Sequence, residues 1–230
     1  TYLPNMLHGK VLRSPHAHAR IKSIDVSKAL ALPGVKAAVT RDDFPDQPAG
    51  AVQPAGEMVI NYRDMTRNIM AREKALYEGH AVAAVAAVNE RVARKALSLI
   101  EVDYEILPHV IDVEEAMKPG APLIREDLIT EGMEPAPKEP SNIAKRVEFG
   151  HGDLDAGFAK ADVVIERTFK TQPVHQGYIE PHVSVGFWDV NDRLTLWTST
   201  QGYFTARDFT ARVLSVPSSK IKVMPAEIGG

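Results

Sequence analysis

The order of apolar and polar positions predicts several strands in the first part of the chain. Residues 6–13 and 20–26 fit two such strands, and residues 35–39 begin another. Between them, Ser27 is placed to cap a short helix that ends at Pro33. We therefore expect strands with short helices between them in this region.

An apolar run at residues 81–88 predicts the clearest buried strand. Asn89 follows as the N-cap of a helix that runs to about residue 100, and residues 102–106 fit a further strand. The helix has one apolar face, formed by Val92, Ala96 and Leu99. Strand, helix and strand together predict a β-α-β unit, whose crossover is right-handed if the two strands are parallel.

Prolines accumulate between residues 118 and 141, and this segment divides the chain. They stand at positions 119, 122, 135, 137 and 140. Proline fits neither a helix interior nor a central strand, because it lacks the N–H donor. We therefore expect a Pro-rich linker at 118–141 between a first domain at 1–117 and a second at 142–230, both of mixed α/β class.

The second domain also mixes strands and helices. The elements that the pattern predicts before its hairpin are strands at residues 142–149 and 163–170 and a helix at residues 154–160. A long strand is expected at 177–188, because apolar residues alternate with others near its end. Residues 189–192 supply turn chemistry, and residues 193–200 return as the partner strand of a hairpin.

The remaining residues, from 198 on, predict strand, helix and strand, followed by a glycine pair. The helix carries an apolar face, a charged pair and a terminating proline, namely Ala206, Phe209 and Val213, Asp208 with Arg212, and Pro217. Gly229 and Gly230 can take φ > 0 and approach a ligand closely, which is typical of the start of a loop that cradles a cofactor. Because the sequence stops there, we expect a fragment of a larger polypeptide or subunit.

Composition narrows the class of protein. Of the 230 residues, 44% are apolar and 25% charged, which is typical of a globular chain with two modest cores. The net charge is −3 and the 27 Lys and Arg residues are scattered rather than striped, so nucleic acid is not an expected partner. There is no Cys, which excludes disulfides, iron–sulfur ligation and a cysteine nucleophile within this chain.

The sequence also bears on the cellular compartment. Its longest apolar run, residues 81–88, is too short to span a bilayer, and the N-terminal residues lack a basic region followed by an apolar stretch. We expect a soluble, cytoplasmic protein with no membrane partner.

Histidines form two candidate clusters in the first domain. His16 and His18 point the same way if their segment is a strand, but two His without a third ligand are a weak metal signal. A loop whose His side chains hydrogen-bond the backbone is favoured instead. His80 precedes the apolar strand, where it either faces a cleft or is satisfied locally in a turn, and the turn is favoured. No metal site is predicted.

Two further segments carry candidate chemistry. Residues 175–182 hold so many polar groups that, if buried, these groups must pair with one another or face a cavity. Glu180 is a candidate general base by residue type, with structural pairing the favoured alternative. Gln201 and Gly202 lie between a strand end and a helix start, where a neutral amide and free N–H groups either serve a ligand oxygen or form a capping turn.

Signature motifs of several enzyme classes are missing from the sequence. It contains no Gly-x-Gly-x-x-Gly, Walker loop, Gly-x-Ser-x-Gly or His-Glu-x-x-His. The sequence therefore gives no support to a serine hydrolase, a P-loop protein or a zincin.

Two ordered sets of motifs together are specific for one family. The first set is residues 6–20, 32–35, 77–82 and 102–104, and the second is residues 152–155, 161–162, 176–182, 199–202 and 228–230. With these motifs the chain resembles, over nearly its whole length, the molybdopterin-binding large subunit of the molybdenum hydroxylases, the xanthine dehydrogenase and aldehyde oxidase family. The first set resembles its α/β hammerhead domain, and the second resembles the start of its molybdopterin-binding region.

The resemblance implies an oxidoreductase that hydroxylates, or reductively dehydroxylates, an aromatic heterocycle, an aldehyde or an aryl-CoA thioester. It implies a molybdenum–molybdopterin cofactor, iron–sulfur clusters and FAD on partner subunits or domains, and an oligomeric complex with the remainder of the subunit. The cofactor-binding residues it implies are Gln201, Gly202, Gly229 and Gly230, with Gln201 hydrogen-bonded to an oxo group of the molybdenum centre.

The same resemblance limits what the chain can do alone. The Phe-Gly-Gly-Lys half of the family's glycine loop and its glutamate base have no counterpart in these residues, so no catalytic residue is assigned and the isolated chain is expected to be inactive. The family often has Gln where this chain has His80, and Glu180 is expected to support the cofactor domain structurally. One alternative is a non-catalytic assembly module, which a reading frame continuing with Phe-Gly-Gly-Lys would argue against. The other is a small-ligand binding module, which a missing electron-transfer partner would favour.

Overall fold

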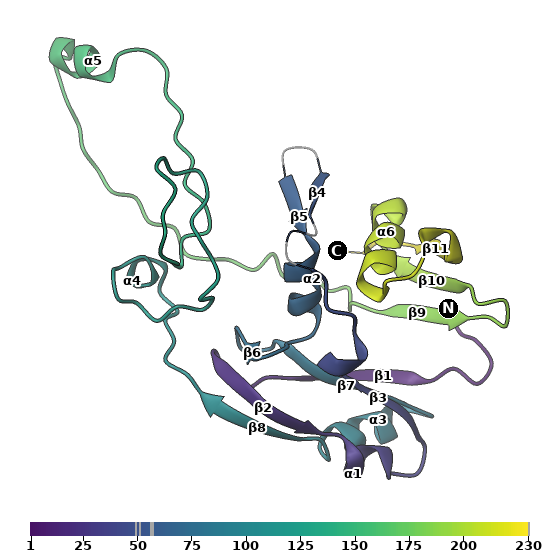
Figure 1. The fold of residues 1–230 in the computed structure, drawn as a ribbon. Coiled ribbons are helices and arrows are strands. Elements are labelled where there is room, and N and C mark those ends of the chain that lie inside the picture. Colours follow the sequence, from purple (N-terminus) through teal and green to yellow (C-terminus); the bar gives the residue numbers. More distant parts are fainter. Residues whose placement is uncertain (49, 51, 56–57, 230) are drawn as a thin grey trace. The chain divides into compact units, whose positions relative to one another are not determined.

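The computed structural model describes residues 1–48, 50, 52–55 and 58–229, which form two compact units (Figure 1). The first unit joins Thr1–His109 to Glu180–Gly229, and the second consists of Val110–Ile179. Several small sheets carry short helices in the first unit. The predicted mixed α/β class is confirmed.

Two antiparallel sheets of three strands each form the framework of residues 1–109. The first consists, in order, of β1 (His8–Arg13), β7 (Ala81–Ala87) and β3 (Val35–Thr40). The second consists, in order, of β6 (Lys74–Ala75), β2 (Ala19–Asp25) and β8 (Glu101–Ile106). A further antiparallel pair is formed by β4 (Val52–Ala55) and β5 (Met58–Asn61).

The main core of this unit lies where α3 (Glu90–Leu97) packs on β7. Its buried members are mostly alanines, namely Ala29, Ala83, Ala87, Ala93 and Ala96, with Val85 and Ile100. Small side chains let the helix approach the strand closely. Asn89 caps α3 as predicted, because its side chain accepts the N–H of Val92 at 2.9 Å, although the helix ends earlier than expected, at Leu97.

The predicted β-α-β unit around α3 is wrong. β7 pairs with β1 and β3, whereas β8 pairs with β2, so the two strands that flank α3 belong to different sheets. Both sheets are antiparallel. Strand partners far away in the sequence therefore decide the topology here, and the order of elements along the chain does not.

The helix α1 (Ser27–Leu30) begins one residue earlier than predicted. Ser27 is its first residue rather than its cap, and the N-cap position is held by Val26, which makes no side-chain capping bond. The carboxylate of Asp25 accepts the Ser27 N–H at 2.8 Å instead. An acceptor two residues away thus replaces the predicted serine cap.

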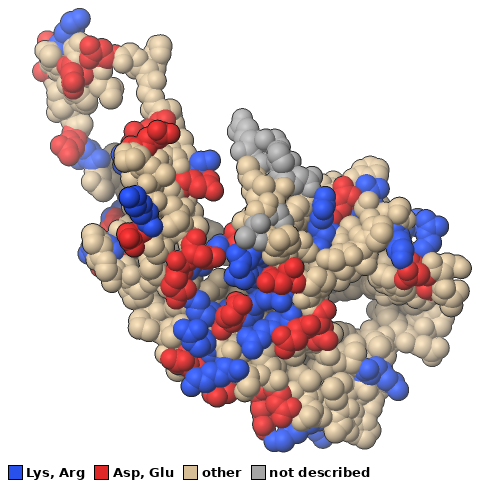
Figure 2. Space-filling view, in the orientation of Figure 1, with Lys and Arg blue, Asp and Glu red and all other residues tan. Residues whose placement is uncertain are grey.

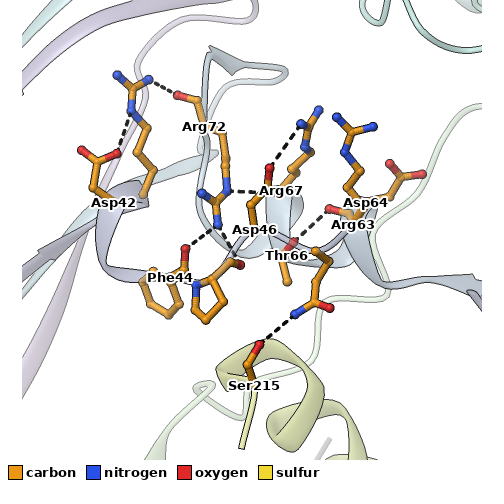
Figure 3. Close-up of polar contacts among 12 residues, drawn as sticks. Asp42, Phe44, Asp46, Arg63, Asp64, Thr66, Arg67, Arg72 and Ser215 are labelled. Atoms are coloured by element: carbon orange, nitrogen blue, oxygen red, sulfur yellow. Dashed lines mark hydrogen bonds and ion pairs between the residues drawn. The ribbon is translucent and has the colours of Figure 1, made fainter. Parts of the chain in front are cut away.

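An arginine network holds the segment after β3 against helix α2 (Tyr62–Ile69), as Figure 3 shows. Arg72 donates to the carbonyl oxygens of Phe44 and Pro45 at 2.7 and 2.9 Å. Asp46 lies 3.9 Å from the Arg67 guanidinium and 3.8 Å from that of Arg72. This segment begins with the short 3-10 helix η1 (Arg41–Asp43), and the network fixes its course on the surface of the unit.

The remaining part of the first unit is a third sheet with one helix against it. Its elements are β9 (Ser184–Trp188), β10 (Leu194–Ser199), α6 (Tyr203–Leu214), the 3-10 helix η2 (Ser218–Lys220) and β11 (Ile221–Ala226). β9 and β10 form the predicted hairpin, and the Asp189 carboxylate accepts N–H groups in its turn. β10 and β11 pair in parallel, with α6 connecting them. The predicted succession of strand, helix and strand is confirmed.

The second unit holds two helices and much irregular chain. The helices are α4 (Val113–Ala116) and α5 (Leu154–Lys160), and α5 has the predicted bounds and an Asp153 cap. The strands predicted at 142–149 and 163–170, and the first part of the one at 177–188, are wrong. Val163, Ile165 and Phe169 of the second predicted strand are 74–85% exposed, because no strand among the described residues lies beside them.

Two further features of the structure are the placing of its charged residues and the length of its helices. On the face drawn in Figure 2, Lys and Arg lie interspersed with Asp and Glu rather than in a basic stripe. Within the described ranges, every helix is too short or too polar to cross a lipid bilayer.

Candidate cofactor site at the carboxyl ends of β10 and β11

The parallel pairing of β10 with β11 brings two segments to one edge of the sheet. Residues 200–202 follow the carboxyl end of β10, and residues 227–229 follow the carboxyl end of β11. In open α/β sheets, ligands bind outside the carboxyl ends of parallel strands. The structure therefore brings Gln201, Gly202 and Gly229 of the predicted site to the same edge. Gly230 lies outside the described residues.

Helix α6 begins at this edge without a side-chain cap. Its N-cap is Gly202, and its first turn contains no acidic residue. The N–H of Gly202 itself is held by the Thr200 hydroxyl at 3.2 Å. The first N–H groups of a helix have no partner within the helix, so this end offers neutral donors to a ligand oxygen. The side chain of Gln201 is exposed beside them.

The opposite end of α6 is anchored on the first part of the chain. Gln47, the residue next to the arginine network, donates to the carbonyl oxygen of Arg212 at 2.8 Å. The Tyr62 ring meets the edge of the Phe209 ring with centroids 6.1 Å apart, and the Arg212 guanidinium lies 5.6 Å from the centre of the Tyr62 ring. These contacts hold the helix while its N-terminal end stays exposed.

Glu180 links the two segments at the edge. Its Oε2 accepts the Gly229 N–H at 2.7 Å. Hydrogen bonds from the Ser199 side chain, first, and from the Gly229 N–H hold the pKa of the Glu180 carboxyl below its usual range, and the charge of His182 acts in the same direction. A carboxylate that is already an acceptor for two groups is a weak base. The favoured interpretation of Glu180 as a structurally paired residue is therefore confirmed.

Gly229 does not use the conformational freedom that the sequence suggested. Its φ lies outside the left-handed region. Its lack of a side chain matters for a close approach instead, because a Cβ on Gly229 would lie 3.3 Å from the Cβ of Glu180. The close approach in the structure is to a side chain of this protein, and the approach to a ligand stays a prediction.

His80 is buried and satisfied locally, as predicted. Its Nε2 lies 2.9 Å from the carbonyl oxygen of Arg67, and its Nδ1 accepts the N–H of Leu76 at 3.2 Å. The Tyr77 ring stacks on it with centroids 4.5 Å apart. Burial lowers the pKa of His80, since the charged imidazole would lose its hydration. The residue ties the end of α2 to the turn before β7.

The other two candidate histidines serve the local structure. His18 is buried, and its Nδ1 lies 2.8 Å from the carbonyl oxygen of Pro108. The His16 ring contacts the edge of the Tyr104 ring, with centroids 5.0 Å apart. The expected hydrogen bond to the backbone is confirmed for His18. Across the part of the chain that the structure describes, no group of three His, Cys, Asp or Glu is placed to hold a metal ion.

Two features of the site were not found from the sequence. The predicted Asp208–Arg212 pair is wrong, because Asp208 pairs with Arg207 at 2.9 Å while Arg212 lies over Tyr62. The bond between Glu180 and Gly229 spans 49 positions and has no local signal. The density of polar groups at residues 175–182 was the one available hint.

Comparison with known proteins defines the class. Residues 1–108 match the family described as "Aldehyde oxidase and xanthine dehydrogenase, a/b hammerhead domain", and residues 135–230 match the "Molybdopterin cofactor-binding domain". A hammerhead domain followed by molybdopterin-binding sequence is the arrangement that the resemblance implied. The chain belongs to the molybdenum hydroxylase family, as part of its large subunit.

Particular relatives agree with this assignment. The chain is 40% identical to the carbon monoxide dehydrogenase large chain of Afipia carboxidovorans, with 99% of this chain and 28% of that protein covered. It is 31% identical to the nicotinate dehydrogenase large molybdopterin subunit of Eubacterium barkeri, with 99% and 48% covered. The structure of quinoline 2-oxidoreductase from Pseudomonas putida 86 superposes with a TM-score of 0.82 at 30% identity, covering 100% of this chain and 28% of that one.

The coverage of these relatives is partial. The chain spans less than a third of the carbon monoxide dehydrogenase large chain and about half of the nicotinate dehydrogenase subunit.

Proposed function

We propose that this chain supplies the hammerhead domain and one wall of the molybdopterin pocket in the large subunit of a molybdenum hydroxylase. The subunit would hydroxylate, or reductively dehydroxylate, an aromatic heterocycle, an aldehyde or an aryl-CoA thioester. The observation that carries this proposal is the edge of β10 and β11, where Gln201 and the uncapped start of α6 lie within the sequence that matches the molybdopterin-binding family.

The donors at this edge fit an oxygen-rich, anionic cofactor. Helix α6 presents free N–H groups, no acidic residue stands in its first turn, and the Gln201 amide is exposed beside them. A neutral amide donates a hydrogen bond without adding a charge that would change the redox properties of a metal centre. The Glu180 carboxylate would repel an anion, but its charge is partly offset by the Gly229 N–H that it accepts and by the side chain of Ser199.

Each proposed site residue has a separate task. Gln201 would donate its side-chain N–H to an oxygen of the cofactor, and the backbone after Gly202 would donate from the first turn of α6. Gly229 would allow close approach of the segment after β11. When bound, a molybdenum cofactor supplies the two-electron chemistry by which an oxygen atom is inserted at an electron-poor carbon.

The domain limits and partners follow from the same proposal. We place the hammerhead domain at 1–117, the linker at 118–141 and the molybdopterin-binding sequence at 142–230. Iron–sulfur and FAD subunits or domains would accept the electrons, since this chain has no Cys with which to hold a cluster. The named relatives are dehydrogenases of carbon monoxide and of nicotinate, so the proposed substrate class is a small molecule with an electron-poor carbon.

The test is expression of the complete subunit together with its partners, followed by metal analysis and an assay panel. The panel contains purines, aldehydes, nicotinate-like rings and aryl-CoA thioesters. Stoichiometric molybdenum and turnover of one of these classes are expected, whereas a complete, folded assembly without molybdenum would refute the proposal.

A pair of variants tests the role of Gln201 within that assembly. Gln201→Ala is expected to lower kcat about 10²-fold or more, by analogy with the loss of one polarising donor from an active site. Asn191→Ala is the matched control, because Asn191 lies in the turn at the other end of β10 and is exposed. Equal activity of the two variants would show that Gln201 does not contribute to the cofactor site.

A further inference from the structure

The carboxylate of Glu180 connects the segments that leave the carboxyl ends of two neighbouring strands. It accepts the N–H of Gly229, three residues past β11, at 2.7 Å. The side chain of Ser199, the last residue of β10, acts on the same carboxylate and lowers its pKa. We call Ser199, Glu180 and Gly229 the carboxylate bridge.

We propose that Glu180 is a positioning residue that fixes the geometry of the cofactor edge, an inference that rests on the function proposed above. Ser199 stands two residues before Gln201 and pairs with Ala226 of β11 in parallel register. By binding the Gly229 N–H beyond the end of β11, whose last residue pairs with Ser199, the carboxylate sets the separation between the Gln201 amide and the chain that follows β11. Glu180 itself touches neither substrate nor cofactor in this role.

Glycine at position 229 is explained by the same bridge. A Cβ there would lie 3.3 Å from the Cβ and 3.6 Å from the Cγ of Glu180, so a side chain would push the carboxylate away. The Gly229 N–H already has a charged acceptor, so it is committed to Glu180. Donors for the cofactor on this edge must therefore come from Gln201, from the start of α6 and from residues other than Gly229.

The strength of the bridge comes from its charge. Hydrogen bonds to an ionised carboxylate are about twice as strong as bonds between neutral groups. Glu180→Gln keeps the length of the side chain and one carbonyl acceptor, whereas Glu180→Ala removes the acceptor altogether. If Glu180 positions the edge, Glu180→Gln should keep more of the hydrogen bonding to Gly229 than Glu180→Ala does.

Nuclear magnetic resonance of the full 230-residue chain tests the bridge directly, with no cofactor present. In chain labelled with ¹⁵N-glycine, the Gly229 amide proton signal is expected to move as acid protonates Glu180, and to stay in place in Glu180→Gln. Amide hydrogen exchange at Gly229 should be at least about tenfold faster in Glu180→Ala, as loss of a bond to a charged group implies. Glu227→Gln, an exposed carboxylate on the same segment, is the matched control and should behave as the wild type.

The titration needs one further control. His182 is the other titratable group whose charge acts on Glu180. The movement of the Gly229 signal should persist in His182→Asn, since the bond to Glu180 remains. The inference would be overturned if neither the pH-dependent shift nor the exchange rate of the Gly229 amide depended on the residue at position 180. This holds whether or not the complete subunit is active.

The complete subunit decides whether the bridge serves the cofactor. Glu180→Gln should retain molybdenum and most activity, whereas Glu180→Ala should lose at least about tenfold in molybdenum content or kcat, with unchanged thermal stability of the assembly. Wild-type molybdenum content and kinetics in Glu180→Ala would overturn the positioning role while leaving the proposed function intact. A wild-type subunit without molybdenum would overturn the proposed function, and the positioning role with it.

Discussion

Replacing His80 by leucine removes both hydrogen bonds of a side chain that is 1% exposed. The Arg67 carbonyl oxygen loses its donor at 2.9 Å, and the Leu76 N–H loses its acceptor at 3.2 Å. An unsatisfied buried polar group costs about 1–3 kcal/mol, so two of them give an expected loss of about 2–6 kcal/mol in the free energy of unfolding. Glutamine can supply one donor and one acceptor, so His80→Gln should cost less than about 1.5 kcal/mol.

Urea unfolding at pH 7.5, followed by circular dichroism, measures both variants. The midpoint should fall clearly in His80→Leu and little in His80→Gln, with similar slopes. A His80→Leu chain as stable as the wild type would show that neither backbone group depends on the imidazole. That result would refute the reasoning from burial.

The pH dependence of stability follows from the same side chain. Burial lowers the pKa of His80 from its ordinary value of 6.5, so the unfolded chain binds a proton at a higher pH than the folded chain does. Stability from this group is therefore fully present above pH 6.5 and falls as the pH drops towards the folded-state pKa. In His80→Gln the loss between pH 7.5 and 5.5 should be smaller than in the wild type. Equal losses would contradict the assignment.

Three substitutions test other parts of the first unit by urea unfolding. Asn89→Ala should cost about 1 kcal/mol because α3 loses its cap, and Asn89→Asp should restore most of it. Gly34→Ala should cost about 1–3 kcal/mol, since Gly34 has φ +96° and a Cβ there would lie 3.0 Å from Val88, whereas Gly150→Ala should be nearly neutral. Tyr62→Ala should cost about 3–5 kcal/mol and expose α6 to proteolysis, because its buried ring contacts Phe209 and Arg212, and the exposed Tyr2→Ala is the control.

The sequence predicted correctly those elements that depend on interactions between residues close together in the chain. The Asn89 cap, the helix at 154–160 and the hairpin of β9 and β10 depend on residues only a few positions apart. Capping groups and turn residues act over that range, so their patterns carry the information. The same holds for the buried apolar strand β7.

Strand pairing is where the sequence failed. The apolar pattern of residues 81–106 is equally compatible with a parallel unit and with two antiparallel sheets, because each strand can pair with any suitable edge. Here β7 finds β1 and β3, and the parallel pair occurs further on, between β10 and β11. The apolar residues at 163–165 likewise favour a strand only if a partner lies beside them, and the described residues contain none.

The candidate site was predicted in part. Gln201 and Gly202 were chosen from the motif and its place between a strand and a helix, and the structure puts them at the expected edge. Glu180 was expected to be structural, but its partner could not be named, because a contact across 49 positions leaves no periodic trace in one sequence. The hydrogen bond from the Gly229 N–H to Glu180 therefore depends on the tertiary fold and not on local sequence.

An experimental structure of the complete subunit with its cofactor tests the central claim most directly. It should place the molybdenum cofactor outside the carboxyl ends of β10 and β11, with the Gln201 side-chain amide within hydrogen-bond distance of a cofactor oxygen and the first turn of α6 facing it. A cofactor bound elsewhere, with Gln201 in contact with water alone, would contradict the account.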